Sequence, residues 1–291
     1  MRRVDGKTQI YAVLGHPVHH SRSPEIQNAA FGAAGLNAVY VALEVPAPRL
    51  GQALEGLHAA RVLGLNLTAP HKEPAFPLTR ERTKEAEEAK AVNTLRWEPE
   101  GWKGHATDGV GFLAWIAETG IEPRGRRVLM MGAGGAARSI LPKLVALGPE
   151  SVHIVSRTAA HAQALSRHAA ETAGPVRLTH AGLGEGAGAG PRGKEPGAGP
   201  ARWDLMVRAL AAESISDGED RWWGAHAPEA AVLDLNYGAR SAEARARARA
   251  EGLRYEDGGA LLIHQGAASF EFWTGEKPSL GAMREALRAV E

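Results

Sequence analysis

The sequence predicts an α/β fold with two units. Short apolar runs alternate with amphipathic stretches in the first third of the chain, which is typical of strands followed by helices. Near the middle, a glycine-rich turn joins another apolar run to a helical stretch, and the alternation then continues. Strand–helix alternation of this kind favours mostly parallel sheets, so we expect one such sheet in each unit.

Composition places the chain among ordinary globular proteins. It has 291 residues, 44% of them hydrophobic and 23% charged, with a formal net charge of +1. This balance argues against a nucleic-acid or membrane partner. The lack of cysteine excludes disulfides, thiolate catalysis and cysteine-ligated metals. No apolar run approaches a membrane span or a signal peptide, so we expect a cytoplasmic enzyme.

The first unit is expected to contain alternating strands and helices. Strands are predicted at 10–15, 38–45, 62–68 and 93–98, and helices at 23–34, 49–61 and 83–91. Ser23 is placed to cap the first helix, with Pro24 at its first helical position and Gly35 at its end.

The second unit begins near Asp108 and contains a complete strand–helix–strand motif at 126–158. Further strands are predicted in the segments VRLTH, WDLMVRAL and AAVLDLNY. The segment from about Gln265 reads as helical, and we expect it to pack back on the first unit. Residues 182–200 are low in complexity and are expected to form a flexible surface insertion without a function.

The glycine turn has the pattern of a dinucleotide site. Gly132, Gly134 and Gly135 follow the apolar run 128–131 and open a helix, whose free amides and partial positive charge suit a pyrophosphate. The third small position of the G-x-G-x-x-G/A pattern is Ala137. The alternative is a glycine turn without a ligand.

The next strand indicates which dinucleotide would bind. It ends in Ser156, Arg157 and Thr158 rather than in the acidic residue that holds the ribose 2′-hydroxyl of NAD. Arg157 can pair with a 2′-phosphate, and the two hydroxyls can hydrogen-bond to it. We therefore predict NADP as the cofactor. The alternative for Arg157 is a solvated surface arginine.

Polar side chains follow several predicted strands or begin helices. These residues are Ser21, Ser23, Thr68, Lys72, Asn93, Asp108 and Gln265. In isolation, Ser23 and Asp108 could be helix caps and Asn93 a turn residue. Together they suit a small, polyhydroxylated, anionic substrate, and they supply one lysine–aspartate pair for proton transfer. His16, His19 and His20 lack a carboxylate that would complete a metal site, so we predict none.

The combination of these motifs resembles the shikimate dehydrogenase family. The likeness runs through nearly the whole chain, in the segments GHPVHHSRSPEIQN, GLNLTAPHK, AVNT, TDGVGF, GAGGAAR, SRT and GGALLIHQGAASFEFWTG. It implies reversible NADPH-dependent reduction of 3-dehydroshikimate to shikimate, a step in aromatic amino-acid biosynthesis. It also implies a substrate domain at 1–108 plus 259–291 and a doubly wound, Rossmann-type NADP-binding domain at 109–258, with the active site in the cleft between them.

The resemblance assigns roles by position. Ser21 and Ser23 would bind the substrate carboxylate, and Lys72 would be the acid/base that Asp108 orients. The ring hydroxyls would be bound by Thr68, Asn93, Asp108 and Gln265, with Tyr237 at the same ligand. The pyrophosphate would be bound by Gly132, Ala133, Gly134, Gly135 and Ala136, the 2′-phosphate by Ser156, Arg157 and Thr158, and the nicotinamide by Leu235 and Gly258.

The chain departs from the family pattern on the cofactor side. Arg208, Ala209 and Leu210 stand where the family usually has an asparagine-led polar loop, and Ser156 replaces a usual asparagine. Two alternatives therefore accompany the main expectation. One is a quinate/shikimate dehydrogenase with broader substrate or NAD use, and the other is a weakly catalytic paralogue that binds shikimate-like ligands. For oligomeric state we expect a monomer or a homodimer.

Overall fold

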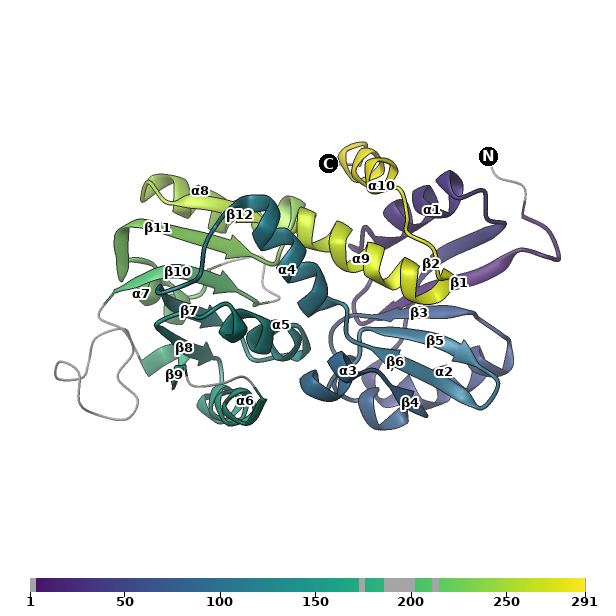
Figure 1. The fold of residues 1–291 in the computed structure, drawn as a ribbon, viewed down its shortest axis with the longest axis horizontal. Coiled ribbons are helices and arrows are strands. Elements are labelled where there is room, and N and C mark those ends of the chain that lie inside the picture. Colours follow the sequence, from purple (N-terminus) through teal and green to yellow (C-terminus); the bar gives the residue numbers. More distant parts are fainter. Residues whose placement is uncertain (1–3, 173–175, 186–201, 211–214, 291) are drawn as a thin grey trace. The chain divides into compact units, whose positions relative to one another are not determined.

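The computed structural model describes residues 4–172, 176–185, 202–210 and 215–290 (Figure 1). The chain forms two compact units. Unit 1 comprises Met1–Phe112 and Leu261–Glu291, and unit 2 comprises Leu113–Ala260. Of the insertion predicted at 182–200, residues 186–200 lie outside the described ranges.

Unit 1 contains a six-stranded sheet in the order β2-β1-β3-β5-β6-β4. Its strands are β1 (Gln9–Gly15), β2 (Ala38–Glu44), β3 (Gly64–Leu67), β4 (Glu81–Arg82), β5 (Thr94–Glu98) and β6 (Gly101–His105). The parallel arrangement predicted from the alternation is found for β2, β1 and β3. β4 is also parallel to β6, so the sheet is mostly parallel as predicted. The exception is β5, which runs antiparallel to β3 and to β6; a two-residue turn at 99–100 joins it to β6 as a hairpin.

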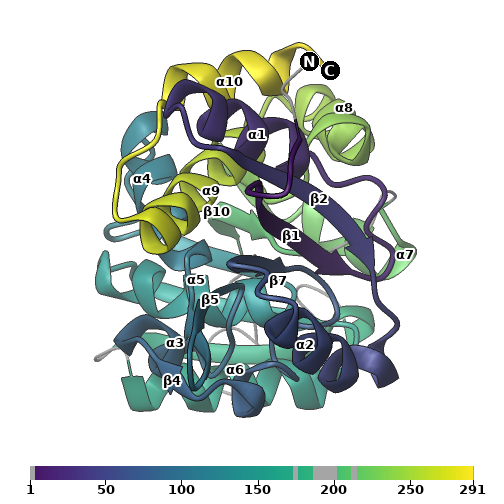
Figure 2. The same cartoon turned by 90° about the vertical axis from the view of Figure 1, so that its right-hand side faces the viewer.

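Helices cover both faces of this sheet. They are α1 (Ser23–Ala33), α2 (Leu50–Ala59), α3 (Lys84–Ala89), the first part of α4 (Asp108–Thr119), most of α9 (Gly259–Thr274) and α10 (Leu280–Arg288). Side chains of β1 alternate between two cores, because successive residues of a strand point to opposite faces. Tyr11 and Val13 pack with α1, α9 and α10, whereas Ala12 and Leu14 pack with α2 and α3. Helices α1 and α10 lie side by side in Figures 1 and 2.

Unit 2 contains a six-stranded sheet in the order β12-β11-β10-β7-β8-β9, and all of its strands are parallel. The strands are β7 (Arg127–Met131), β8 (Ser151–Ser156), β9 (Arg177–Gly182), β10 (Trp203–Arg208), β11 (His226–Asp234) and β12 (Arg254–Asp257). The strand order reverses at β7, which lies between β8 and β10. This doubly wound topology confirms the predicted fold class, and ligands of such sheets bind where the order reverses.

The helices of unit 2 are α5 (Gly135–Ala146), α6 (Ala159–Thr172), α7 (Asp217–Trp223) and α8 (Ala242–Ala250). Helices α5 and α6 lie side by side (Figures 1 and 2). Helices α7 and α8 pack on a core of β10 and β11 that includes Trp203, Trp222 and Trp223. In the part of the chain that the structure describes, no helix is both long and apolar enough to cross a membrane.

Candidate active site

The lysine and the aspartate predicted to transfer protons lie together in unit 1. The Nζ atom of Lys72 donates to Oδ2 of Asp108 at 2.6 Å, and the side chains are 16% and 10% exposed. Lys72 lies in the turn that follows β3, where its carbonyl accepts from the amide of Val92. Asp108 is the first residue of α4. Because both side chains are largely removed from water, their ion pair is stronger than a surface pair.

Asn93 connects this pair to its surroundings. Its Nδ2 atom donates to Oδ1 of Asp108 at 2.9 Å and to Oγ1 of Thr107 at 2.9 Å. Its Oδ1 atom accepts from the amide of Thr107 at 2.7 Å. The side chain is 3% exposed. Asn93 is therefore more than a turn residue, because its amide fixes Asp108 on the side opposite to Lys72.

A buried polar network supports Asn93, and sequence reasoning missed most of it. Thr94 and Ser269 exchange a hydrogen bond at 2.8 Å, and Nδ2 of Asn66 donates to Ser269 at 2.9 Å. The hydroxyl of Tyr40 in turn donates to Asn66 at 2.7 Å. Each of these side chains is at most 6% exposed.

Gln265 approaches the same cluster from α9. Its Oε1 atom accepts from Asn93 at 3.4 Å and from Thr107 at 3.5 Å. Helices α4 and α9 come very close at this point, because a Cβ atom at Gly111 would lie 2.7 Å from the amide nitrogen of Gln265. The structure thus brings together Lys72 and four polar residues from three separate parts of the sequence. The four are Asn93, Thr107, Asp108 and Gln265.

The serine pair lies at the start of α1. The prediction that Ser23 caps this helix is wrong, because the helix begins at Ser23 and its N-cap is Arg22, with no side-chain capping bond. Ser23 is 7% exposed, and its amide donates to Oγ of Ser21 at 3.3 Å. Among the described residues the hydroxyl of Ser23 has no hydrogen-bond partner, which leaves it available to a ligand.

Thr68 lies between β3 and the Lys72 turn. A Cβ atom at Gly15 would lie 2.4 Å from Cγ2 of Thr68, so the end of β1 requires glycine there. His71, which the sequence analysis did not single out, is fully buried, and its Nε2 atom lies 2.8 Å from the carbonyl of Val45. Burial lowers the pKa of His71, so the neutral imidazole ties the turn to the end of β2.

The predicted pyrophosphate loop has the geometry of a dinucleotide site. Gly132 has φ +109°, and a Cβ atom there would lie 2.6 Å from the carbonyl oxygen of Ala209 at the end of β10. This contact lies at the point where the strand order reverses. By contrast, no atom of the described residues lies within 4 Å of the Cβ position of Gly134, at the N-cap of α5. The first turn of α5 has no acidic residue that would repel a phosphate.

The other predicted cofactor residues follow neighbouring strands of unit 2. Ser156 ends β8 and is buried, whereas Arg157 and Thr158 are exposed. Within the described ranges, Arg157 has no ion pair or hydrogen bond. Leu235 and Gly258 are in contact, because a Cβ atom at Gly258 would lie 2.2 Å from the carbonyl oxygen of Leu235.

Tyr237 lies in unit 2, whereas the lysine cluster lies in unit 1. Its assignment to the substrate therefore stays a prediction. No cluster of three or more His, Asp or Glu side chains among the described residues could hold a metal ion. His16 instead pairs with Glu44 at 3.0 Å.

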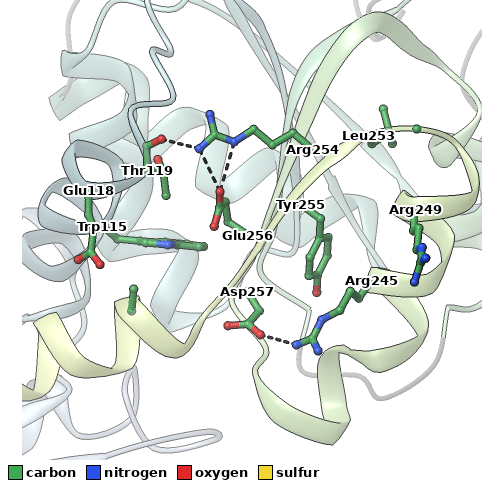
Figure 3. Close-up of a pocket in the computed structure, with 12 residues that line it drawn as sticks. Trp115, Glu118, Thr119, Arg245, Arg249, Leu253, Arg254, Tyr255, Glu256 and Asp257 are labelled. Carbon is green, nitrogen blue, oxygen red and sulfur yellow. Dashed lines mark hydrogen bonds and ion pairs between the residues drawn. The ribbon is translucent and has the colours of Figure 1, made fainter. Parts of the chain in front are cut away.

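A pocket of about 840 Å³ lies elsewhere in unit 2, around the edge strand β12 (Figure 3). Its lining includes three arginines and three acidic residues, Arg245, Arg249, Arg254, Glu118, Glu256 and Asp257. Arg245 pairs with Asp257, and Arg254 pairs with Glu256. No residue of the predicted sites lines this pocket, so it does not mark the site of the chemistry.

Taken together, unit 1 offers a positioned amine, a carboxylate and several hydrogen-bonding groups, which suits proton transfer to a hydroxylated ligand. Among the described residues, unit 2 offers the N-terminus of α5 without an acidic first turn, and after β8 an exposed arginine without a partner, which suits a phosphorylated dinucleotide. These are the two components that a dehydrogenase of a small alcohol requires.

Three family models match the chain. The model of the shikimate dehydrogenase substrate binding domain matches residues 13–95, and the model named shikimate / quinate 5-dehydrogenase matches residues 116–181. The model of the shikimate 5′-dehydrogenase C-terminal domain matches residues 261–288.

Relatives and solved structures agree with these matches. A shikimate dehydrogenase (NADP(+)) of Rubrobacter xylanophilus is 37% identical over 98% of this chain and 97% of its own. The crystal structure of shikimate dehydrogenase from Aquifex aeolicus has a TM-score of 0.81 at 29% identity, covering 98% of this chain and 100% of the other. The Thermus thermophilus shikimate 5-dehydrogenase, in complex with NADP(H) and shikimate, has a TM-score of 0.78 at 31% identity, over 98% and 100% of the chains.

Proposed function

This chain belongs to the shikimate dehydrogenase family, and from that premise we propose how its own residues perform the family's reaction. The chain is an NADP-dependent oxidoreductase that interconverts shikimate and 3-dehydroshikimate, a step of aromatic amino-acid biosynthesis. The single observation that supports the proposed mechanism best is the contact between Lys72 and Asp108 at 2.6 Å.

We assign the proton transfer to Lys72. Reduction of the substrate carbonyl leaves negative charge on its oxygen, and the ammonium of Lys72 donates a proton there. In the oxidation direction the neutral amine takes the proton from the hydroxyl. Positioned proton transfer of this kind contributes about 10²- to 10⁴-fold in rate.

We assign to Asp108 the orientation of the lysine. One of its oxygens accepts from Lys72 and the other accepts from Asn93, so the carboxylate cannot rotate without losing a hydrogen bond. A fixed carboxylate holds the amine in one position, which lowers the cost of reaching the transition state. Asp108 would also accept from a neighbouring hydroxyl of the substrate.

The remaining polar groups of unit 1 suit the rest of the substrate. The hydroxyls of Ser21 and Ser23 would donate to its carboxylate. Thr68, Asn93 and Gln265 would bind the ring hydroxyls, because amide and hydroxyl groups can both donate and accept.

The residues of unit 2 fit NADP. The backbone amides of Gly134 and Gly135 at the start of α5 would bind the pyrophosphate, since no described residue lies within 4 Å of the Cβ position of Gly134. Arg157 is exposed and unpaired among the described residues, which suits the 2′-phosphate. Ala133 and Ala136 add only small side chains beside these glycines. When bound, NADPH supplies the hydride. Leu235 and Gly258 would contact the nicotinamide and Tyr237 the substrate.

Quinate is the second candidate substrate, because the model that matches residues 116–181 names both shikimate and quinate. Steady-state rates with shikimate and with quinate, each with NADP and with NAD, separate the possibilities. The proposal predicts the highest kcat/KM for shikimate with NADP. Comparable values for quinate or NAD would support the broader enzyme, and very low values throughout would support the weakly catalytic paralogue. A cytoplasmic location and a monomeric or homodimeric state stay predictions.

A further inference from the structure

A buried cluster of charges lies where the chain departs from the family pattern. Arg208 is the last residue of β10 and is 1% exposed. Its Nε atom lies 2.5 Å from Oε1 of Glu219 in α7, and its Nη1 atom lies 3.2 Å from Oδ2 of Asp234 at the end of β11. Both carboxylates are also at most 1% exposed. Arg208 therefore points into the protein interior.

The cluster is well satisfied by hydrogen bonds. Oδ2 of Asp234 accepts from the hydroxyl of Tyr255 at 2.9 Å, and Oδ1 accepts from Nδ2 of Asn236 at 2.8 Å. Burial, strengthened by the carboxylate of Asp234, raises the pKa of Tyr255, so this hydroxyl stays a proton donor. A buried charge group with this many partners holds its side chains in one arrangement.

The same residues join the strand ends that carry the cofactor site. The carbonyl of Arg208 accepts from the amide of Leu235 at 2.9 Å. Nδ2 of Asn236, which Asp234 holds, donates to the carbonyl of Leu210 at 2.8 Å. The carbonyl of Asn236 then accepts from the amide of Gly258 at 2.9 Å. The ends of β10, β11 and β12 are thus connected through the cluster.

The connection also extends to the glycine loop. Ala209 directly follows Arg208, and its carbonyl lies against Gly132 so closely that a side chain would not fit between them. The amide of Ala209 donates to the carbonyl of Met131 at 2.7 Å. A change in the position of Arg208 would therefore reach the start of the pyrophosphate loop through a direct backbone contact.

We propose that Arg208 is a positioning residue for NADP, which acts through Glu219 and Asp234 to fix the strand ends on which the cofactor rests. This inference depends on the proposed function, because it takes NADP as the ligand of these strand ends. The fork of the guanidinium is essential, since it joins two carboxylates from different elements. A lysine is a single point charge and would not hold both carboxylates at the same separation.

Two variants test the proposal. Arg208→Lys keeps the charge but loses the fork. Arg208→Met/Glu219→Gln removes one cation and one anion together, so the buried net charge is unchanged. The guanidinium that joins Glu219 to Asp234 is lost. We expect the Kd for NADP⁺, measured by isothermal titration calorimetry, to rise about 10- to 100-fold in both, as for small misplacements within a site. At saturating NADP⁺, kcat and the KM for shikimate should stay within about twofold of wild type.

A matched control is available at the other end of the same strands. Arg127 and Asp204 form a bidentate pair at the amino ends of β7 and β10, with contacts of 2.9 Å and 2.8 Å. Arg127→Met/Asp204→Asn also removes one arginine and one carboxylate, here a partly exposed pair at the opposite end of the strands from the cofactor edge. It should lower Tm and leave the Kd for NADP⁺ within about twofold of wild type.

The outcomes separate the two proposals. If the wild type fails to bind NADP⁺, the proposed function is refuted together with this inference. If the wild type binds and a folded Arg208→Met/Glu219→Gln protein binds equally well, only the inference is refuted. If the double variant does not fold, the Kd for NADP⁺ of Arg208→Lys is the criterion, and a Kd equal to that of the wild type refutes the inference. A rise in Kd for the control as large as for the Arg208 variants would also overturn the inference, because the effect would then be general destabilisation.

Discussion

The Nζ atom of Lys72 lies 2.6 Å from Oδ2 of Asp108, although thirty-six positions separate the two residues in the sequence. The turn after β3 carries the lysine, and the first turn of α4 carries the aspartate. Asn93, which precedes β5, holds the other oxygen of Asp108. Three strand and helix termini thus converge on one carboxylate, and the predictions below follow from this convergence and from the geometry of the cofactor unit.

Removal of the Asn93 side chain is expected to affect both stability and substrate binding. Asn93→Ala leaves the buried amide of Thr107 without its partner, which costs about 1–3 kcal/mol in unfolding free energy. The KM for shikimate should rise as well, because Asp108 loses one of its hydrogen bonds. Urea denaturation and steady-state kinetics measure the two effects. Glu55→Ala, an exposed change in α2 whose side chain has no partner among the described residues, should alter stability by less than about 0.5 kcal/mol; equal losses would contradict this explanation.

Gly132 is expected to tolerate no side chain. Gly132→Ala combines φ +109° with a Cβ atom 2.6 Å from the carbonyl oxygen of Ala209, so the loop must move. We expect NADP⁺ affinity to fall at least about tenfold, as for small misplacements within a site, measured by calorimetry. In the control Gly224→Ala the added Cβ would lie more than 4 Å from every described neighbour, and affinity should be unchanged. Wild-type affinity in Gly132→Ala would show that this loop does not hold the cofactor.

Arg157 is expected to determine the preference for NADP over NAD. Arg157→Gln removes a charge-assisted contact with the 2′-phosphate, and the KM for NADP should rise about 10- to 100-fold. The KM for NAD, which lacks this phosphate, should stay the same. Arg167→Gln, another exposed arginine in unit 2, is the control. A parallel rise for both cofactors would show that Arg157 does not read the 2′-phosphate.

His153 is expected to make unit 2 less stable in mild acid. Burial, with a smaller contribution from His180, lowers the pKa of His153 to about 4 from the ordinary histidine value of 6.5. The folded state therefore resists protonation of His153. The contribution of this residue to the free energy of unfolding is fully present above about pH 6.5 and is lost as the pH decreases towards 4. The loss attributable to this group is at most about 3 kcal/mol.

His153→Asn isolates this effect, because Asn retains a polar group near Thr179 but does not titrate. Urea denaturation at several pH values between 8 and 4 should show a smaller decrease in unfolding free energy for the variant than for the wild type. The same pH dependence in both proteins would exclude His153 as a cause.

The sequence predicted the elements whose strands are apolar. The runs that became β1, β7 and β8 are buried on both faces over most of their length, and their apolar composition indicates this. The sequence pattern did not indicate strands at β6 or β12. Strand β6 reads GWKGH and β12 reads RYED, so neither has the apolar pattern of a strand, and each forms because a neighbour supplies hydrogen bonds.

The same limit applies to the site. Lys72 and Asp108 could be selected because each lies in a polar cluster at the end of a predicted strand or the start of a predicted helix, and these clusters match the motifs of the family. Thr107 and Ser269 could not, because a serine or threonine resembles many others until its partners are known. Ser269 reaches Thr107 at 3.2 Å across a sequence separation of 162, which only the packing of α9 on unit 1 establishes. The inward direction of Arg208 was likewise not visible in the sequence.

The most direct test of the mechanism is the turnover of Lys72→Ala with shikimate and NADP⁺, compared with Lys84→Ala, a change at an exposed lysine of α3. The proposed acid/base role predicts that kcat falls about 10²- to 10⁴-fold, while the Kd for NADP⁺ stays at the wild-type value and the control keeps full turnover. Near-normal turnover of Lys72→Ala would contradict the assignment of this lysine to the proton transfer.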